Sequence, residues 1–407
     1  MNYKGKYFRS LLLAIGLCLV TISSTWGQYA LNSDFIDKNL TEAIEQIGFL
    51  APNIPADKFP RTYEQGKSIS SNSAWWTSGF YPGTLLYLYE YSGNNELLNK
   101  AKEKLKILEQ EKLNTSTHDL GFMLYCSFGN ALRLTDDSSA YKEVLLTGAN
   151  SLITRFSPIT KTIRSWEGWT YPVIIDNMMN LEFLTQASKI SGDRKYRDIA
   201  IIHANTTMRN HYRKDMSCYH VVDYNPTTGG IVAKKTAQGA FDESAWARGQ
   251  AWGLYGYTMM YRETRDKRYL KFAEKIADFI LNHPNLPEDF IPYWDFNASD
   301  LPVESPYAAA YKSTRDASAA AINASALLEL SSFVKPAKAK QYLQSAEKML
   351  VSLSSPPYKA TIGSNGGFIL MQSVGSIPHK SEIEVPLTYA DYYYVEALMR
   401  YKKMLKK

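Results

Sequence analysis

The sequence contains few residues of the kinds that build disulfide scaffolds and metal centres. It has 3 cysteines and 6 histidines in 407 residues, and their spacing matches no zinc-binding pattern. It also lacks a glycine-rich loop with a lysine before a helix, which would indicate phosphate binding. A G-x-S-x-G motif, which marks the nucleophile of many serine hydrolases, is absent too. The sequence therefore predicts no metal, no cofactor and no nucleotide.

Long hydrophobic runs are absent except near the N-terminus. Residues 11–20, LLLAIGLCLV, follow three basic residues and are too short to span a membrane comfortably. Small residues at 25–27 suit cleavage before Gln28, so residues 1–27 are predicted to be a signal peptide. We therefore expect an exported protein, periplasmic or secreted. Cys18 could carry a lipid anchor, but the bulky Leu17 before it argues against one.

The excess of positive over negative charge is also small. The net charge is +6, and residues 1–27 carry Lys4, Lys6 and Arg9 but no acid, which leaves +3. This balance does not favour nucleic acid or a membrane surface as a partner. The two remaining cysteines, Cys126 and Cys218, could form one disulfide or stay free. We expect a monomer or a weak homo-oligomer.

Helical periodicity dominates residues 28–407, and no linker divides them. Helices that are apolar nearly all round alternate with amphipathic ones, and short turns join them in pairs, which predicts inner and outer helices. About six such pairs indicate an all-α fold, an (α/α)6 barrel in one domain, with long loops at 51–73, 284–314 and 355–386. A hairpin is expected within 218–234. The expected helices are 34–50, 79–92, 96–112, 119–134, 138–155, 174–191, 194–211, 243–264, 267–282, 315–332, 336–353 and 387–405.

Aromatic residues, in contrast, are abundant: 29 Tyr, 16 Phe and 8 Trp, or 13% of the chain. A large core uses many of them, but several tryptophans lie in loop-like segments such as SAWWTSGFYPG (73–83) and SWEGWTYP (165–172). Aromatic rings can cover the apolar face of a pyranose while neighbouring polar groups bind its hydroxyls. The pattern is therefore typical of a sugar-binding cleft.

Two acids occur in unusual places. Asp176 lies inside the apolar and aromatic run SWEGWTYPVIIDNMMNLEFL, and Asp119 begins another apolar helix. A structural explanation exists for each: Pro172 could start a helix with Asp176 in its first turns, and Thr117 or Asp119 could be a helix cap. In an (α/α)6 barrel, however, alternate inner helices start at one mouth, so both acids could meet there. Paired carboxylates in a partly dry site suit glycoside chemistry, because burial and neighbouring charge keep one of them protonated.

A third candidate segment is KKTAQGAFDESAWARGQAWGLYGY (234–257). Arg248 and Trp252 are four residues apart on one face of an apolar helix, and Gln238 precedes them in a loop. A buried arginine needs an anion, which could be Asp242 or Glu243 of the chain or a ligand group. His220, considered alone, is more often a structural histidine.

Several of these segments together resemble one known family. The segments SAWWTSGFYPG, THDLGFM, YPVIIDNMMNLEFL, HVVDY, AQGAFDESAWARGQAWGLYGY and VPLTYADYYYVEALMRY are similar, in order, to unsaturated glucuronyl hydrolases of glycoside hydrolase family 88. The resemblance implies an (α/α)6 barrel that removes a non-reducing 4,5-unsaturated uronic acid from oligosaccharides released by polysaccharide lyases. It also implies Asp176 as the general acid/base and Asp119 as its carboxylate partner. The pocket residues that it implies are Trp76, His118, Trp166, His220, Gln238, Arg248 and Trp252.

Three alternatives remain at this point: an unsaturated rhamnogalacturonyl hydrolase, a sugar epimerase on a similar barrel, and a glycan-binding protein without activity. The quoted motifs favour the glucuronyl type, and epimerases of this shape usually use more histidines than His118 and His220. Residues 373–380 are expected near the neighbouring sugar. There, Lys380 is either solvated or a partner for a sulfate. Whether the substrate is of the glycosaminoglycan or the ulvan type is left open.

Overall fold

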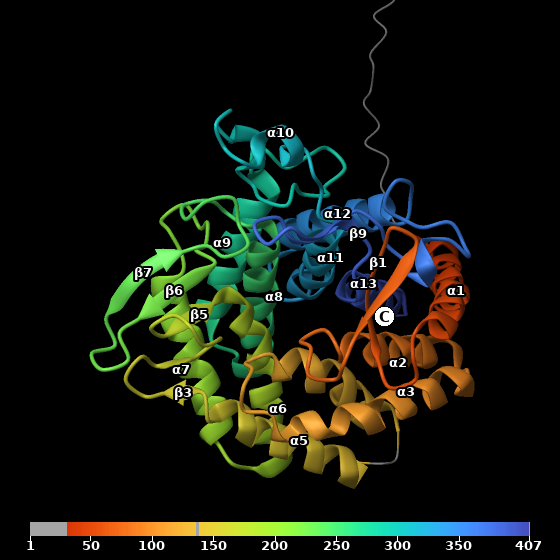
Figure 1. The fold of residues 1–407 in the computed structure, drawn as a ribbon, viewed down its shortest axis with the longest axis horizontal. Coiled ribbons are helices and arrows are strands. Elements are labelled where there is room, and N and C mark those ends of the chain that lie inside the picture. Colours follow the sequence, from red (N-terminus) through yellow and green to blue (C-terminus); the bar gives the residue numbers. More distant parts are fainter. Residues whose placement is uncertain (1–30, 136–137, 407) are drawn as a thin grey trace, which may run out of the picture.

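The computed structural model describes residues 31–135 and 138–406. The predicted signal peptide, with Cys18, lies outside the described residues. All twelve expected helices are present in the described part of the chain, and they are arranged in a ring (Figure 1).

Six helical segments form the inner layer of the ring. Each packs against the next around a closed circle, and the last returns to the first. Their apolar surfaces explain this position: α8 and α11, for example, are buried along nearly their whole length. The inner segments are α2 (Phe80–Ser92), η3 with α4 (Gly121–Gly129 and Asn130–Leu134), η4 with α6 (Ile175–Asn180 and Leu181–Ser191), α8 (Ala247–Thr264), α11 (Ala317–Ser331) and α13 (Thr388–Leu405).

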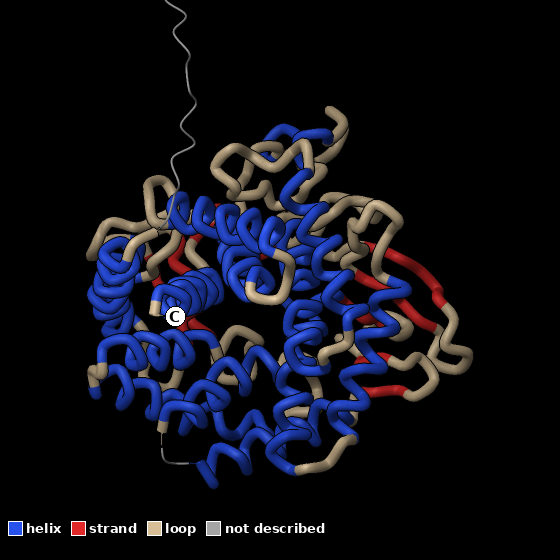
Figure 2. Tube along the Cα trace, turned by 180° about the vertical axis from the view of Figure 1, so that it is seen from behind, coloured by secondary structure: helices blue, strands red, loops and turns tan. Residues whose placement is uncertain are grey.

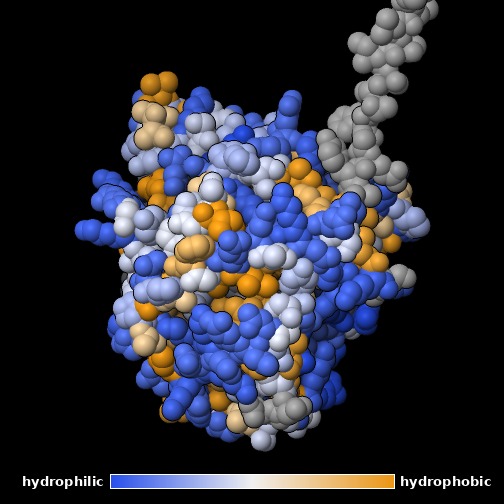
Figure 3. All heavy atoms as spheres, turned by 90° about the vertical axis from the view of Figure 1, so that its right-hand side faces the viewer, coloured by the Kyte–Doolittle hydropathy of each residue, from blue (hydrophilic) through white to orange (hydrophobic). Residues whose placement is uncertain are grey.

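Six amphipathic helices pack around this layer, each against an inner neighbour. They are α1 (Ser33–Leu50), α3 (Asn95–Leu108), α5 (Ser138–Ile153), α7 (Lys195–Asn210), α9 (Lys267–Asn282) and α12 (Pro336–Leu353). The expected (α/α)6 barrel is therefore confirmed. Viewed from the side of α1, the surface is mostly hydrophilic, with hydrophobic residues in small groups (Figure 3). Among the described residues, no helix combines the length and the apolar character that crossing a membrane requires.

Strands are short and lie in the connecting segments, and one group gathers at a single side of the ring (Figure 2). The expected hairpin is present as β6 (Val221–Tyr224) and β7 (Ile231–Lys235), and β5 (Pro172–Ile174) extends it into an antiparallel sheet in the order β5-β6-β7. The remaining pairs are β1 (Phe59–Glu64) with β2 (Lys67–Ser71), β3 (Phe156–Ser157) with β4 (Thr162–Ile163), and β8 (Ser373–Ser376) with β9 (Ser381–Val385).

Three helix starts differ from expectation. Pro172 does not start a helix, because it pairs with Asp223 in the sheet, and the helical residues begin at Ile175. The segment after Asp119 winds as a π-helix before it becomes α-helical, and α8 begins only at Ala247. A short helix, α10 (Ala308–Tyr311), in the 284–314 loop was not expected.

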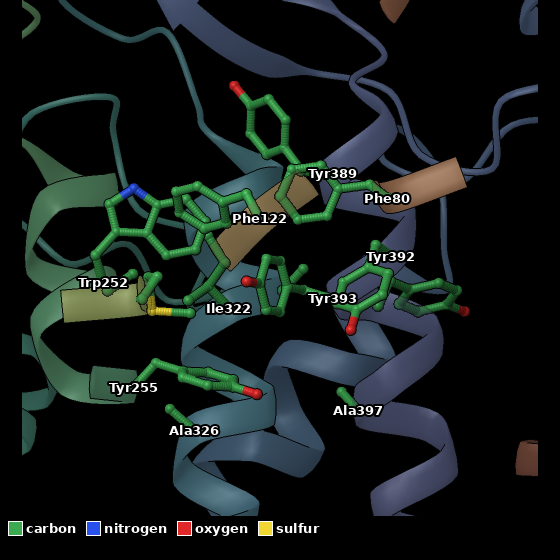
Figure 4. Close-up of a cluster of buried hydrophobic side chains, with 14 of the residues drawn as sticks. Phe80, Phe122, Trp252, Tyr255, Ile322, Ala326, Tyr389, Tyr392, Tyr393 and Ala397 are labelled. Atoms are coloured by element: carbon green, nitrogen blue, oxygen red, sulfur yellow. The ribbon is translucent and has the colours of Figure 1, made fainter. Parts of the chain in front are cut away.

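An aromatic cluster fills the middle of the ring (Figure 4). Phe122 and Trp252 lie 5.1 Å apart between ring centroids, and Trp252 and Tyr393 lie 5.4 Å apart, both from inner helices. Such contacts stabilise the core beyond the burial of apolar area alone. The cluster blocks the barrel, so a ligand can be held at one end but cannot pass through.

Candidate active site

A cavity of about 410 Å³ lies at the end of the barrel where the inner helices begin. Its walls come from β1, the loop before α2, the loop before β5, the start of β6, the segment after β7, the start of α8, strands β8 and β9 and the start of α13. The lining residues are Arg61, Trp75, Trp76, Trp166, Trp169, His220, Ala237, Gln238, Arg248, Gly375, Ser376, His379, Ser381, Glu382 and Tyr389. Predicted residues from five separate segments therefore meet here.

Asp176 lies beside this cavity, in the first turn of η4, and only 7% of its surface is exposed. Its Oδ2 atom is 3.7 Å from Nε2 of His220. Burial raises the pKa of Asp176 to about 7; the charge of Arg248 opposes this shift and that of Asp119 adds to it. The carboxyl group is therefore close to half protonated near neutral pH.

His220 is held in one tautomer by its neighbours. Its Nδ1 atom accepts hydrogen bonds from the backbone N–H groups of Ala237 at 3.0 Å and of Gln238 at 3.2 Å. Since Nδ1 is an acceptor, the proton of the neutral ring is on Nε2, the atom that faces Asp176. Burial holds the pKa of His220 well below its usual value, so the ring stays neutral.

Asp119 is brought near Asp176 by a network of amides between η3 and η4. Nδ1 of His118 lies 3.0 Å from Oδ1 of Asn177, the residue after Asp176. Asn180 donates to the same Oδ1 at 2.9 Å and accepts from the backbone N–H of Gly121 at 2.8 Å. The two segments approach so closely that a Cβ at Gly121 would lie 2.6 Å from Oδ1 of Asn180.

Asp119 is also bound locally. Thr117 donates to Oδ2 of Asp119 at 2.8 Å, and the backbone N–H of Asp119 donates to the Thr117 hydroxyl at 3.1 Å. Oδ1 of Asp119 lies 3.4 Å from Nε2 of His118. Neither Thr117 nor Asp119 caps the helix, because the residue at its start is Leu120, which makes no side-chain capping bond. The carboxylate of Asp119 is instead held by Thr117 and lies near the second acid.

The two internal partners considered for Arg248 were wrong. Asp242 instead accepts from the backbone N–H of Thr236, and α8 begins too late for Glu243 to be part of it. The guanidinium of Arg248 pairs with Asp316 at 3.3 Å and donates to the carbonyls of Val374 and Gly375, to the latter at 2.7 Å. Only the fold brings Asp316 and β8 to this position, because they follow Arg248 by more than 60 residues.

Gln238 and Arg248 share one acceptor. Nε2 of Gln238 donates to the carbonyl of Gly375 at 3.1 Å, beside the bond from Arg248. Arg248 also lies over the ring of Trp246, with 4.4 Å between its Cζ atom and the ring centroid. These contacts fix the β8 segment at the rim of the cavity.

The predicted tryptophans take different positions. Trp166 and Trp169 pack edge to face at 5.9 Å on the wall, and Trp76 packs against Tyr389 at 4.9 Å between centroids. Trp252 does not line the cavity: it belongs to the aromatic cluster, with its indole nitrogen at the edge of that cluster (Figure 4). Several residues of the site were not predicted from the sequence: Trp75, Trp169, Trp246, Arg61, Tyr389 and Glu382. All of them except Arg61 and Glu382 lie in segments already noted for their aromatic residues or for their resemblance to the family.

Several polar atoms here are buried and have no hydrogen-bond partner in the described protein. They are Oδ2 of Asp176, Nε2 of His220, Nε of Arg248, Nε1 of Trp246, Nε1 of Trp252 and the hydroxyl of Tyr389. Buried polar groups of native proteins are nearly always paired with protein or water. So many unpaired groups in and beside one cavity indicate a site for a polar ligand.

The pairing of the two cysteines was left open by the sequence. Cys126 and Cys218 are free thiols, so they do not form a disulfide with each other. No group of three or more histidine, cysteine, aspartate or glutamate side chains in the described ranges is arranged to hold a metal.

The 373–380 segment is at the cavity, as expected. Gly375, Ser376 and His379 belong to its wall, and the Ser376 hydroxyl lies 2.7 Å from Nδ1 of His379. Lys380 is exposed and is not part of the wall. His379 is therefore the basic side chain of this segment that a bound sugar would meet first.

Comparison with known proteins agrees with this geometry. The model of the family described as Glycosyl Hydrolase Family 88 matches residues 55–258 of this chain. An unsaturated glucuronyl hydrolase of Formosa agariphila is 44% identical over 360 residues, covering 87% of each chain. An unsaturated chondroitin disaccharide hydrolase of Streptococcus pneumoniae is 31% identical over 377 residues, covering 90% of this chain and 91% of the relative.

Solved structures show the same fold. The crystal structure of an unsaturated glucuronyl hydrolase specific for heparin matches with a TM-score of 0.86 and 46% identity, covering 92% of this chain and 99% of that one. The enzyme of Bacillus sp. GL1, described as responsible for the degradation of glycosaminoglycan, matches with a TM-score of 0.83 and 27% identity, covering 91% and 97%. The resemblance of the sequence motifs is confirmed, and with it the prediction that the protein is an enzyme. The chain belongs to glycosyl hydrolase family 88, the family of its unsaturated glucuronyl hydrolase relatives.

Proposed function

We propose that this enzyme removes the 4,5-unsaturated uronic acid from the non-reducing end of oligosaccharides produced by polysaccharide lyases. The observation that carries the proposal is Asp176: a buried carboxyl group with a pKa of about 7, unpaired Oδ2, and a histidine N–H facing it. A general acid/base needs a pKa near the working pH and access to the reacting atom. Asp176 satisfies the first condition and lies beside an aromatic cavity that suits the second.

The substrate itself suggests the chemistry. Its C4=C5 bond is attached to the ring oxygen and is therefore an enol ether, which accepts a proton at C4. Asp176 gives that proton, the positive charge at C5 is shared with the ring oxygen, and water adds at C5. The carboxylate of Asp176 then takes a proton from this water. The resulting hemiketal opens, and the glycosidic bond at C1 is lost by rearrangement.

Neighbouring groups support both halves of this cycle. The negative charge of Asp119 and the burial of Asp176 favour the protonated acid at the start. After proton transfer, the Nε2–H of His220 and the indole N–H of Trp252 are donors beside the new carboxylate. Direct hydrolysis at C1 would instead need one carboxylic acid to protonate the glycosidic oxygen. It would also need a second carboxylate to activate the water or to attack the sugar.

For the substrate class, we propose oligosaccharides of the glycosaminoglycan or the ulvan type. The tryptophan walls provide faces for pyranose rings. The solved relative with 46% identity is described as specific for heparin, and this makes unsaturated heparin disaccharides the first substrates to test. Chondroitin, hyaluronan and ulvan disaccharides form the comparison set.

We also propose that residues 1–27 direct export and are removed before Gln28, which places the enzyme in the periplasm or outside the cell. N-terminal sequencing of the protein from its native host tests this. A mature chain that begins at Gln28 supports the proposal. A lipid-modified Cys18 at the N-terminus would replace it with membrane anchoring.

The deciding experiment is turnover in heavy water, followed by NMR. Hydration predicts one deuterium at C4 of the released sugar, together with loss of the ultraviolet absorbance of the conjugated double bond. Initial product without deuterium at C4 would overturn hydration and favour attack at C1. Binding of the disaccharide with no loss of absorbance would indicate a glycan-binding protein without activity.

A further inference from the structure

A second hollow, of about 440 Å³, lies between the β1–β2 hairpin and the end of α1. It shares no residue with the active-site cavity. Its lining residues are Phe49, Asn53, Tyr63, Gly66, Lys67, Ser68, Gly363, Ser364, Asn365, Gly366 and Gly367. Its volume is within the range of small-molecule sites. We call it the hairpin hollow.

A glycine-rich loop passes close to the aromatic rings of the hairpin hollow. Phe49 is 46% exposed, although it is a large apolar residue. Gly363 has a φ of +81°, and a Cβ there would lie 3.7 Å from Cζ of Phe49. At Gly366, with a φ of +62°, a Cβ would lie 2.3 Å from Cδ2 of Tyr63. The backbone at Gly366 therefore packs directly against the Tyr63 ring, where only glycine fits, whereas the ring of Phe49 stays exposed.

Polar groups surround these rings. The amide nitrogens of Asn53 and Asn365 are used within the chain, by the carbonyl of Phe49 and by those of Phe368 and Leu370. Their amide oxygens therefore remain as acceptors for ligand hydroxyl groups. The exposed Lys67 adds a positive charge. The exposed ring of Phe49, the amide oxygens and one cation together suit an anionic sugar.

One strand, β1, runs from the active-site cavity to the hairpin hollow. Arg61 lines the active-site cavity and Tyr63 lines the hollow, and both belong to β1. Two residues of strand span about 7 Å. Figure 1 shows β1 between the middle of the ring and α1. Arg61 is fixed between the two sites, since it pairs with Glu382 at 2.9 Å and lies over Trp75 at 4.1 Å from the ring centroid.

From this continuity we infer that the hairpin hollow is a distal subsite, which binds the reducing-end sugars of substrates longer than a disaccharide. The inference rests on the proposed function, because it assumes that the unsaturated end of the same molecule occupies the active-site cavity. A tetrasaccharide would reach the hollow past Arg61, whereas a disaccharide would not. Chain length would then affect binding without changing the chemistry at C4.

The test compares an unsaturated heparin tetrasaccharide with the corresponding disaccharide. The double variant Phe49→Ala/Lys67→Ala removes the exposed ring and the cation, and neither residue belongs to the active-site cavity. A matched control, Leu113→Ala/Lys340→Ala, removes an exposed apolar residue and an exposed lysine elsewhere. We expect kcat/KM for the tetrasaccharide to fall about tenfold in the first variant, mainly through KM. Disaccharide turnover and thermal midpoint should match the wild-type protein in both variants.

The outcomes separate this inference from the proposed function. If the wild-type enzyme turns over neither oligosaccharide, the proposed function fails. If it turns over both and Phe49→Ala/Lys67→Ala leaves the tetrasaccharide kinetics unchanged, the hairpin hollow is not a subsite. Equal losses for both oligosaccharides would also overturn it, because they would show a general effect on the fold. Calorimetry of the tetrasaccharide with Asp176→Asn, with and without the double change, measures the same difference without turnover.

Discussion

Nε2 of His220 and Oδ2 of Asp176 lie 3.7 Å apart, both are buried, and neither has a hydrogen-bond partner among the described residues. The distance is too long for a hydrogen bond. It is short enough for His220 to stabilise a charge that appears on Asp176 during the reaction. The pair is therefore arranged for an acid that alternates between neutral and charged forms, and the predictions below depend on that alternation.

The first prediction concerns proton transfer. Asp176→Asn keeps the shape of the side chain but cannot give a proton, so turnover should fall by about two to four orders of magnitude or more while binding of the disaccharide persists. Asp119→Asn should also reduce turnover severely. The loss of ultraviolet absorbance measures rate, and calorimetry measures binding. Asp198→Asn, on the exposed surface of α7, is the control. Near-normal rates in the Asp176 variant would assign the acid elsewhere.

The second prediction concerns pH and stability. The pKa of Asp176 rises from 3.8 to about 7 on folding, so the folded state binds a proton more tightly than the unfolded state. Its contribution to the free energy of unfolding therefore declines between about pH 4 and pH 7, where the buried group becomes charged. Asp176→Asn removes this cost. The variant should have a higher thermal midpoint than wild type at pH 8, a smaller difference at pH 5 and nearly the same midpoint at about pH 4. A difference that does not depend on pH would contradict the raised pKa.

The third prediction also follows from the pKa of Asp176. Catalysis requires protonated Asp176, so kcat/KM should decline above about pH 7. His220 should add no rising limb near its usual pKa, because burial keeps it neutral. A pH profile from pH 4 to pH 9 with the disaccharide checks both parts. A second limb between pH 6 and pH 7 that disappears in His220→Gln would show that the histidine does titrate.

The fourth prediction concerns Arg248 as a positioning residue. Lysine keeps the charge but lacks the planar fork with which Arg248 reaches Asp316 and two carbonyls of β8. Arg248→Lys should lower kcat/KM about tenfold to a hundredfold, through a displaced Gly375 segment, with the fold intact. Arg268→Lys, at an exposed position, is the control. If circular dichroism shows that Arg248→Lys unfolds, the residue serves stability rather than the site.

The fifth prediction tests the approach of the two acids. A Cβ at Gly121 would lie 2.6 Å from Oδ1 and 2.7 Å from Cα of Asn180. Gly121→Ala should therefore push η3 from η4, destabilise the protein by about 1–3 kcal/mol and lower turnover. Gly48→Ala is the matched control, since nothing lies within 4 Å of its Cβ position. Full activity in Gly121→Ala would show that the spacing of η3 and η4 does not matter for catalysis.

Much of the fold was predictable from local pattern. The apolar surface of α8 and the amphipathic surface of α9 are visible as periodicities within each segment, because a helix repeats every few residues. Helix starts were less predictable: Pro172 entered a strand because a partner strand about 50 residues later was available to pair with it. Periodicity does not report such a partner.

The features of the candidate site were also predictable only where they belong to a single segment. The sequence by itself determined the alternation of inner and outer helices, the unusual acids Asp119 and Asp176, and the family motifs around them, because these are properties of single segments. Only the tertiary structure decided that Asp316 and β8 bind Arg248, that Nε2 of His220 faces Asp176, and that β1 joins the active-site cavity to the hairpin hollow. Each of these relationships joins residues far apart in the chain. Closure of the ring of helices creates them, and with them the burial that raises the pKa of Asp176.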